Sequence, residues 1–220
     1  MAANIAVTNR LRGSDADNQK KANMSNLADT YRNVESDPIR WLDTARGFMM
    51  CVRLIWNKLA PLFDDGFPPQ KRHAEMFAYC QSFLLLTGFA FENLYRGMLT
   101  ACGSNWQKAL YAKGGHALFK HLSSVATLAD DEQYLVKRLE TYLQWAGRYP
   151  VPKRSGDYVD AVEKFLCAFK GSDLDVATGL FARLEEKLLA DAAKSANRAE
   201  DAFLQSLLSQ KIQNDDAARK

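Results

Sequence analysis

A chain of 220 residues with a formal net charge of +3 has room for one medium-sized domain with an extension, or for two small domains. Its 47% hydrophobic and 25% charged residues are ordinary for a soluble globular protein, and the charge is too weak to indicate nucleic-acid binding by itself. The four cysteines show no C-x-x-C spacing, which excludes the usual zinc and redox motifs.

Two cysteines and the N-terminus bear on the compartment. Cys51 and Cys80 fall in apolar helical patterns, so we expect buried free thiols in a reducing cytosol. The first residues lack the apolar core of a signal peptide. The sequence therefore predicts a soluble cytoplasmic protein.

The chain begins with a polar stretch. Residues 1–35 are rich in Asn, Asp, Ser and Lys without a sustained period, which predicts an arm that is flexible or loosely docked. Ser36-Asp37-Pro38 is then a helix start signal, because it offers a capping side chain followed by proline at the first helical position. Apolar residues at three- and four-residue spacing follow as far as Leu59, and Pro61 ends the predicted helix.

The segment 74–100 is predicted to be a long buried central helix. Residues 76–91 carry no charge, and their apolar residues cover most sides of a helix. The uncharged run is shorter than the roughly 20 residues that a membrane span needs, so no membrane is expected. A glycine such as Gly88 in an exposed helix lowers its stability by about 1 kcal/mol relative to alanine. The close approach of a neighbouring helix would explain why glycine is present at this position. Residues predicted to form one stripe are Phe77, Cys80, Leu84, Gly88, Phe91, Leu94, Tyr95 and Met98.

Helical patterns continue to the end of the chain. Short helices are predicted around 106–111 and 116–122, and longer ones from Asp130 or Asp131 to Ala146, over 158–169, and from the cap 171–173 onward. Beyond Asp191 a weak apolar stripe remains, which a partner helix could cover. The sequence predicts an all-α helical bundle over 36–192, with a C-terminal helical extension over 193–220.

Metal and cofactor chemistry are not indicated. The histidines are His73, His116 and His121, and the last two are five residues apart, which does not place them on one helix face. No Ser, Cys or glycine-rich catalytic motif is present. We expect neither a metal nor a cofactor.

Three polar residues are candidates for catalysis. Glu92 and Arg96 are four apart with the acid first, which favours an ion pair along the helix. They either orient the end of the central helix or line a site that handles an anion or a proton. His116 follows a glycine pair, where an imidazole either caps the next helix or acts as a general acid–base.

A short basic loop is the candidate for binding RNA or a nucleotide. Arg148, Tyr149, Lys153 and Arg154 combine cations for phosphate with an aromatic ring for base stacking. The alternative is a solvated connector whose arginine folds back onto the C-terminus of a helix. Both interpretations remain open from the sequence.

Three stretches resemble bacterial HEPN-like proteins: AFENLYRG at 90–97, GHALFKHL at 115–122 and WAGRYP at 145–150. The resemblance covers residues 74–152. It implies a helical bundle that often dimerises, found among RNA-cleaving toxins, their relatives in defence systems, and nucleotide-associated modules.

The chain departs from active members of that family at the catalytic motif. The active HEPN ribonucleases resemble one another in an arginine followed four to six residues later by histidine, and no arginine of this chain is so followed. The favoured function is a non-catalytic, dimerising module that binds a protein or a nucleic acid. The alternatives are a divergent metal-independent ribonuclease or nucleotide-handling enzyme using Glu92, Arg96, His116 and Arg148, and a purely structural helical adaptor.

Overall fold

The computed structural model describes residues 24, 27, 30, 31, 33, 35–64, 70–103, 116–147 and 152–218. No strand occurs among these residues and most of them are helical, which confirms the predicted all-α class. The chain divides into two compact units, residues 1–37 and residues 38–220. The predicted short helix over 106–111 lies outside the described residues.

The first unit is described at a few positions. Met24, Leu27, Thr30 and Tyr31 are helical, although the sequence analysis found no sustained period there. The side chains of Met24, Leu27 and Tyr31 are exposed at spacings of three and four residues. Most of the predicted arm over 1–35 lies outside the described residues.

The second unit begins with helix α2, Pro38–Leu59. Pro38 is its first residue, as the start signal predicts, because proline at this position lacks only an N–H that would have no partner in the helix. Pro61 opens a separate short helix, α3, over Pro61–Asp64. The residues of α2 buried in the core repeat at helical spacing: Leu42, Ala45, Met49, Val52 and Leu59.

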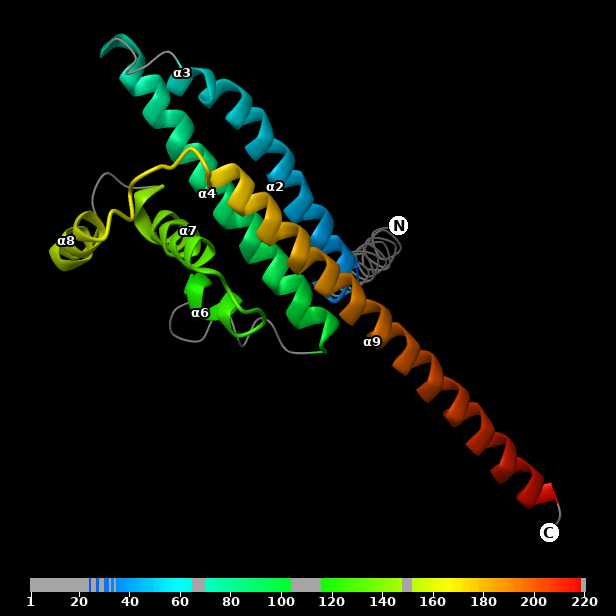
Figure 1. The fold of residues 1–220 in the computed structure, drawn as a ribbon. Coiled ribbons are helices and arrows are strands. Elements are labelled where there is room, and N and C mark those ends of the chain that lie inside the picture. The colour runs from blue at the N-terminus through cyan, green and yellow to red at the C-terminus, as the bar shows by residue number, and fades with distance from the viewer. Residues whose placement is uncertain are drawn as a thin grey trace, which may run out of the picture. The chain divides into compact units, whose positions relative to one another are not determined.

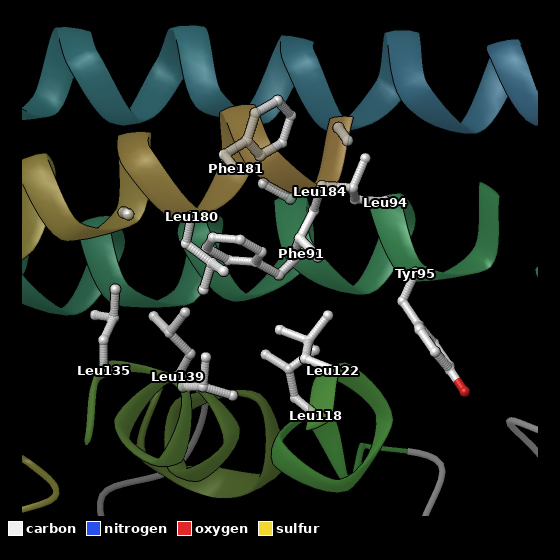
Figure 2. Packing of buried hydrophobic residues seen from close by; sticks show 14 of the residues in the cluster. Phe91, Leu94, Tyr95, Leu118, Leu122, Leu135, Leu139, Leu180, Phe181 and Leu184 are labelled. Carbon is white, nitrogen blue, oxygen red and sulfur yellow. The ribbon is translucent and has the colours of Figure 1, made fainter. Parts of the chain in front are cut away.

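Helix α4, Gln70–Ala101, is the centre of this unit. Contacts with α2, α6, α7 and α9 surround it, and Figure 1 shows α2 and α4 side by side, joined through α3. Figure 2 shows Phe91 and Leu94 of α4 between leucines of α6 and α7 on one side and Leu184 of α9 on the other. The predicted buried central helix is confirmed over 83–101, where every residue is buried or half-buried.

Two predictions of burial near this core are wrong. Phe77 is 60% exposed, because the first turns of α4 precede the part of the helix around which the core forms. Cys51 is exposed, since the buried stripe of α2 passes through its neighbour Val52 and turns position 51 to solvent. Cys80 is half-buried.

One described helix, His73–Ala101, passes the length and hydropathy test for a membrane span. A single such helix is weak evidence, because core helices of soluble proteins share these properties. Here the same helix is the one that α2, α6, α7 and α9 contact.

Gly88 lies where α4 meets the next part of the bundle. A Cβ atom added to Gly88 would lie 2.8 Å from Cγ of Leu143, which is closer than such atoms approach. The predicted close approach of a neighbouring helix is therefore confirmed.

That neighbour is a helix with an irregular end. Helix α7 covers Asp130–Thr141 and continues as a π-helical turn, η1, over Tyr142–Ala146. Gly147 closes the turn by donating its N–H to the carbonyl of Tyr142 at 3.1 Å. Its lack of a side chain matters, because a Cβ at Gly147 would lie 2.9 Å from Leu85. The short helix α6, Leu118–Ser123, precedes α7.

Helix α8 covers Ser155–Glu163, so the prediction of a helix over 158–169 is wrong at both ends. Two backbone hydrogen bonds end the helix. Leu166 donates its N–H to the carbonyl of Ala161, and Phe165 donates its N–H to the carbonyl of Val162. This pair of bonds is a Schellman closure, which needs a left-handed residue and usually has glycine there. Phe165 takes that place with φ of 52°, so the sequence contains no glycine to signal the end.

The last helix, α9, runs over Asp173–Ala218. Its first turns carry the core residues Ala177, Leu180, Phe181, Leu184 and Leu188. The helix then continues through residues 193–218 without a break, as Figure 1 shows.

Candidate functional site

The carboxylate of Glu92 is the centre of the candidate site. Glu92 lies in the C-terminal part of α4 and its side chain is 6% exposed. One oxygen, Oε1, accepts a hydrogen bond from Nη2 of Arg96 at 3.2 Å and lies 3.2 Å from Nδ1 of His116. The structure therefore brings together three of the four predicted catalytic candidates.

The two side chains next to this carboxylate come from different segments. Arg96 is one helical turn further along α4, which is the geometry that the four-residue spacing predicts. His116 lies in the turn that leads into α6. Nδ1 of His116 is buried and has no hydrogen-bond partner among the described residues, so its contact with Glu92 is one of charge and proximity.

Aromatic rings border the three polar side chains. Trp41 of α2 lies under the guanidinium of Arg96, with its ring centre 5.4 Å from Cζ. The ring of His121 stacks on that of Tyr95, with centroids 4.8 Å apart and planes within 5°. The cluster thus joins α2, α4 and α6.

The fold disturbs the ionisation of His121. Burial lowers the pKa of His121 from 6.5, because the charged imidazolium loses water. The negative charge of Glu92 raises the pKa, and the positive charges of Lys120 and His116 lower it further. The net direction is downward, which favours a neutral ring against Tyr95.

The predicted basic loop is only partly described. Arg148 and Tyr149 lie outside the described residues. Lys153 and Arg154 are exposed and precede α8. Nε of Arg154 lies 3.4 Å from the carboxylate of Asp157, so its charge is partly balanced by the first turn of that helix.

Metal binding finds no support among the described residues, where no group of three or more His, Cys, Asp or Glu is placed to hold an ion. His73, the remaining histidine, is exposed near the start of α4.

The sequence analysis missed a second polar region between α7, η1 and α8. Glu140 of α7 accepts the N–H of Phe119 at 2.8 Å and the amide of Gln144 at 3.2 Å. Burial raises the pKa of Glu140, and these two hydrogen bonds oppose the rise. A cavity of about 310 Å³ opens beside it, lined by Lys137, Glu140, Gln144, Trp145, Asp160 and Lys164 among others.

Nothing in the sequence marks this second region in advance. Its residues come from two helices, and it depends on the π-helical turn and on the early end of α8. The four-residue spacing of Glu140 and Gln144 was the one available signal, and such pairs are common on helix surfaces.

No family model, curated protein or solved structure matches the chain. The resemblance to HEPN-like proteins therefore stays a prediction that rests on the three short stretches quoted above.

Proposed function

We propose that the protein is a non-catalytic, HEPN-like helical module of the cytoplasm that dimerises and binds a protein or a nucleic acid. The non-catalytic part of this proposal rests on one observation. Oε1 of Glu92 lies 3.2 Å from Nη2 of Arg96 and 3.2 Å from Nδ1 of His116, so groups of the protein itself already surround this oxygen.

A buried carboxylate with two such neighbours is suited to holding structure together. Its charge is balanced inside the protein, and taking away one partner of a buried pair leaves an uncompensated charge or donor. The contact ties the segment that precedes α6 to the end of α4. The absence of an arginine followed four to six residues later by histidine supports the same conclusion.

An RNA-cleavage assay without divalent metal tests this proposal directly. Purified wild type, His116→Ala and Arg148→Ala are incubated with labelled single-stranded RNA. We expect no cleavage above buffer from any of the three. Cleavage by the wild type that both substitutions abolish would show an enzyme and overturn the proposal.

Stability measurements separate a structural cluster from a reactive one. We expect Glu92→Gln to lower the free energy of unfolding by more than the roughly 1 kcal/mol of a surface ion pair. Asp157→Asn is the matched control, because its ion pair with Arg154 is exposed. A Glu92→Gln variant as stable as the control would contradict the structural role.

One observation favours the alternative of a divergent ribonuclease or nucleotide-handling enzyme. Nδ1 of His116 lies 3.2 Å from the carboxylate of Glu92, without a hydrogen bond to it, and Nε2 is left for a second partner, as in many general bases. The side chain of His116 is 42% exposed and so reaches solvent. The cleavage assay above decides between the two functions.

The proposed protein partner has a candidate site on α9. Its last core residue is Leu188, and the helix runs about 45 Å further to Ala218. Most of the stability of a helix in a protein comes from packing of an apolar face, so pairing with another helix would stabilise this part of α9. The weak stripe of Ala199, Phe203, Leu207 and Leu208 in the sequence predicts an apolar face for that pairing.

Light scattering tests the proposed dimer and the part that α9 takes in it. We expect a mass of about twice 24.7 kDa for the full chain. A chain ending at Ala192 keeps the core residues of α9, so it should remain folded while losing whatever the extension binds. A full chain that stays monomeric at high concentration would contradict the dimer.

A further inference from the structure

The apolar face of helix α8 is exposed, whereas a helix of a globular protein normally buries its apolar face. Ala161 is its one buried residue, whereas Tyr158, Val159 and Val162 are 48%, 51% and 50% exposed. Phe165, directly after the helix, is 69% exposed. Spacings of three and four residues place Tyr158, Val159 and Val162 on one face of the helix, and the exposed ring of Phe165 follows directly after its end.

The opposite face of α8 is polar and faces α7 and η1, and the ring of Tyr158, at the edge of the apolar face, lies 6.3 Å from the ring of Trp145. Asp157, Asp160 and Lys164 line the cavity of about 310 Å³ that separates α8 from α7 and η1. Asp160 and Lys164 form an ion pair with each other. Figure 1 shows α8 to the side of the bundle, beyond α7. The amphipathic pattern of this helix is therefore inverted with respect to its own domain.

The backbone at the end of α8 is a second indication that the apolar face is functional. Phe165 occupies the left-handed position of the Schellman closure with φ of 52°, where glycine would cost nothing. A bulky side chain in this conformation is strained, and such outliers cluster at functional sites. Tyr134 holds the position by donating its hydroxyl to the carbonyl of Phe165 at 3.0 Å.

We propose that Tyr158, Val159, Val162 and Phe165 form a docking surface for an amphipathic helix of a partner protein. The area of this surface favours a partner helix over a second copy of the chain. Four side chains that are about half exposed offer a few hundred Å², the size of a typical functional patch. A stable dimer buries about 800 Å² on each partner, whereas a helix laid on a short apolar stripe needs less.

The charges at the start of α8 indicate which charges a partner should carry. Lys153 and Arg154 are exposed, and the side chain of Arg154 is 85% exposed although it is near Asp157. A helix with apolar residues on one face and carboxylates beside them matches both features. This inference rests on the proposed function and deepens it by naming a second surface for a protein partner, separate from the C-terminal part of α9.

The test uses a defined probe and the full-length protein. A fluorescein-labelled peptide of about 18 residues carries leucines at three- and four-residue spacing on one face and glutamates elsewhere. Its fluorescence anisotropy is followed on titration with wild type, Val162→Asn and Phe165→Gly. Leu54→Asn is the matched control, because Leu54 is a similarly exposed (67%) apolar residue on α2.

We expect saturable binding by the wild type and by Leu54→Asn, weakened about tenfold or more by each α8 substitution. Phe165→Gly should also raise Tm by roughly 2–4 °C, because glycine relieves the left-handed strain of about 1 kcal/mol. Weaker binding by a more stable variant excludes misfolding as its cause. A peptide of the same composition in scrambled order should not bind.

Several outcomes would overturn the docking surface. Equal binding by wild type and both α8 variants would place the peptide elsewhere, and absent binding would remove the surface altogether. Single-stranded RNA that binds the wild type and loses affinity with Val162→Asn would assign the face to nucleic acid. A dimer that Val162→Asn dissociates would assign it to a second copy. The cleavage assay does not depend on α8, so failure here leaves the non-catalytic proposal standing.

Discussion

Arg138 and Asp173 form a buried ion pair that joins α7 to the first residue of α9. Two parallel hydrogen bonds of 2.5 Å run from the guanidinium to the two carboxylate oxygens, and the side chains are 1% and 2% exposed. Arg138 also donates to the carbonyl of Ala168, and Asp173 accepts the N–H of Lys170. These bonds fix the loop between α8 and α9.

The first prediction concerns the loss of one partner of this pair. We expect Asp173→Asn to lower the free energy of unfolding by about 3–5 kcal/mol, because it leaves the guanidinium of Arg138 buried without its counter-charge. Urea denaturation measures the change. The double variant Arg138→Met with Asp173→Leu should recover most of the loss, since two apolar side chains leave no buried charge. A single variant within 1 kcal/mol of wild type would contradict this.

The second prediction compares two glycines within helices. A Cβ at Gly88 of α4 would lie 2.8 Å from Leu143, whereas nothing lies within 4 Å of one at Gly47 of α2. We expect Gly47→Ala to stabilise the protein by up to about 1 kcal/mol, through helix propensity alone. Gly88→Ala should destabilise it by about 1–3 kcal/mol, since overpacking outweighs the same gain. Thermal unfolding of both variants checks the opposite signs, and equal shifts would refute the close approach.

The sequence predicted the features that depend on local periodicity. The helix over 74–100 follows from spacing, because a helix repeats its environment every three to four residues, and the start signal at Ser36-Asp37-Pro38 and the close contact at Gly88 follow from local sequence. The ion pair of Glu92 and Arg96 was predictable for the same reason. Local patterns therefore predict the helical bundle and, in the candidate site, the pairing of Glu92 with Arg96.

The remaining features depend on contacts between distant parts of the chain. Arg138 and Asp173 are 35 residues apart, and nothing near either residue marks its partner. The end of α8 was missed because a phenylalanine takes the position where glycine usually signals a stop. The approach of His116 to Glu92 depends on the path of the chain between α4 and α6, which no spacing rule gives.

The third prediction is a loss of stability in mild acid that His121 causes. Burial lowers the pKa of His121 in the folded state, so the unfolded chain binds a proton more readily. The stabilisation from the neutral ring is complete above pH 6.5 and is lost as pH falls through the lowered pKa. We expect Tm to decrease between about pH 7.5 and pH 5. Differential scanning fluorimetry across this range measures the slope.

Two variants assign that slope to the residue. His121→Phe keeps a ring against Tyr95 but cannot take up a proton, so its Tm should fall less steeply in acid than that of the wild type. His73→Gln is the control for removing an imidazole elsewhere, because His73 is exposed near the start of α4. Glu92, Lys120 and His116 also shift the pKa of His121, so both variants keep all three residues. Parallel profiles for His121→Phe and wild type would rule out this origin.

The fourth prediction ranks the cysteines by reactivity. Burial, together with the negative charge of Asp173, raises the pKa of Cys80 to about 11. Only about one thiol in a thousand is then ionised at pH 8, and the thiolate is the form that reacts with iodoacetamide. Cys51 and Cys102 are exposed, so we expect them to be alkylated well before Cys80.

Timed alkylation followed by peptide mass spectrometry gives the order. In concentrated urea the fold no longer shields Cys80, so all four cysteines should react at similar rates, which serves as the internal control. Asp173→Asn removes one cause of the raised pKa, and it should speed the alkylation of Cys80 in protein that remains folded. Alkylation of Cys80 in the native protein as fast as that of Cys51 would contradict the raised pKa of Cys80.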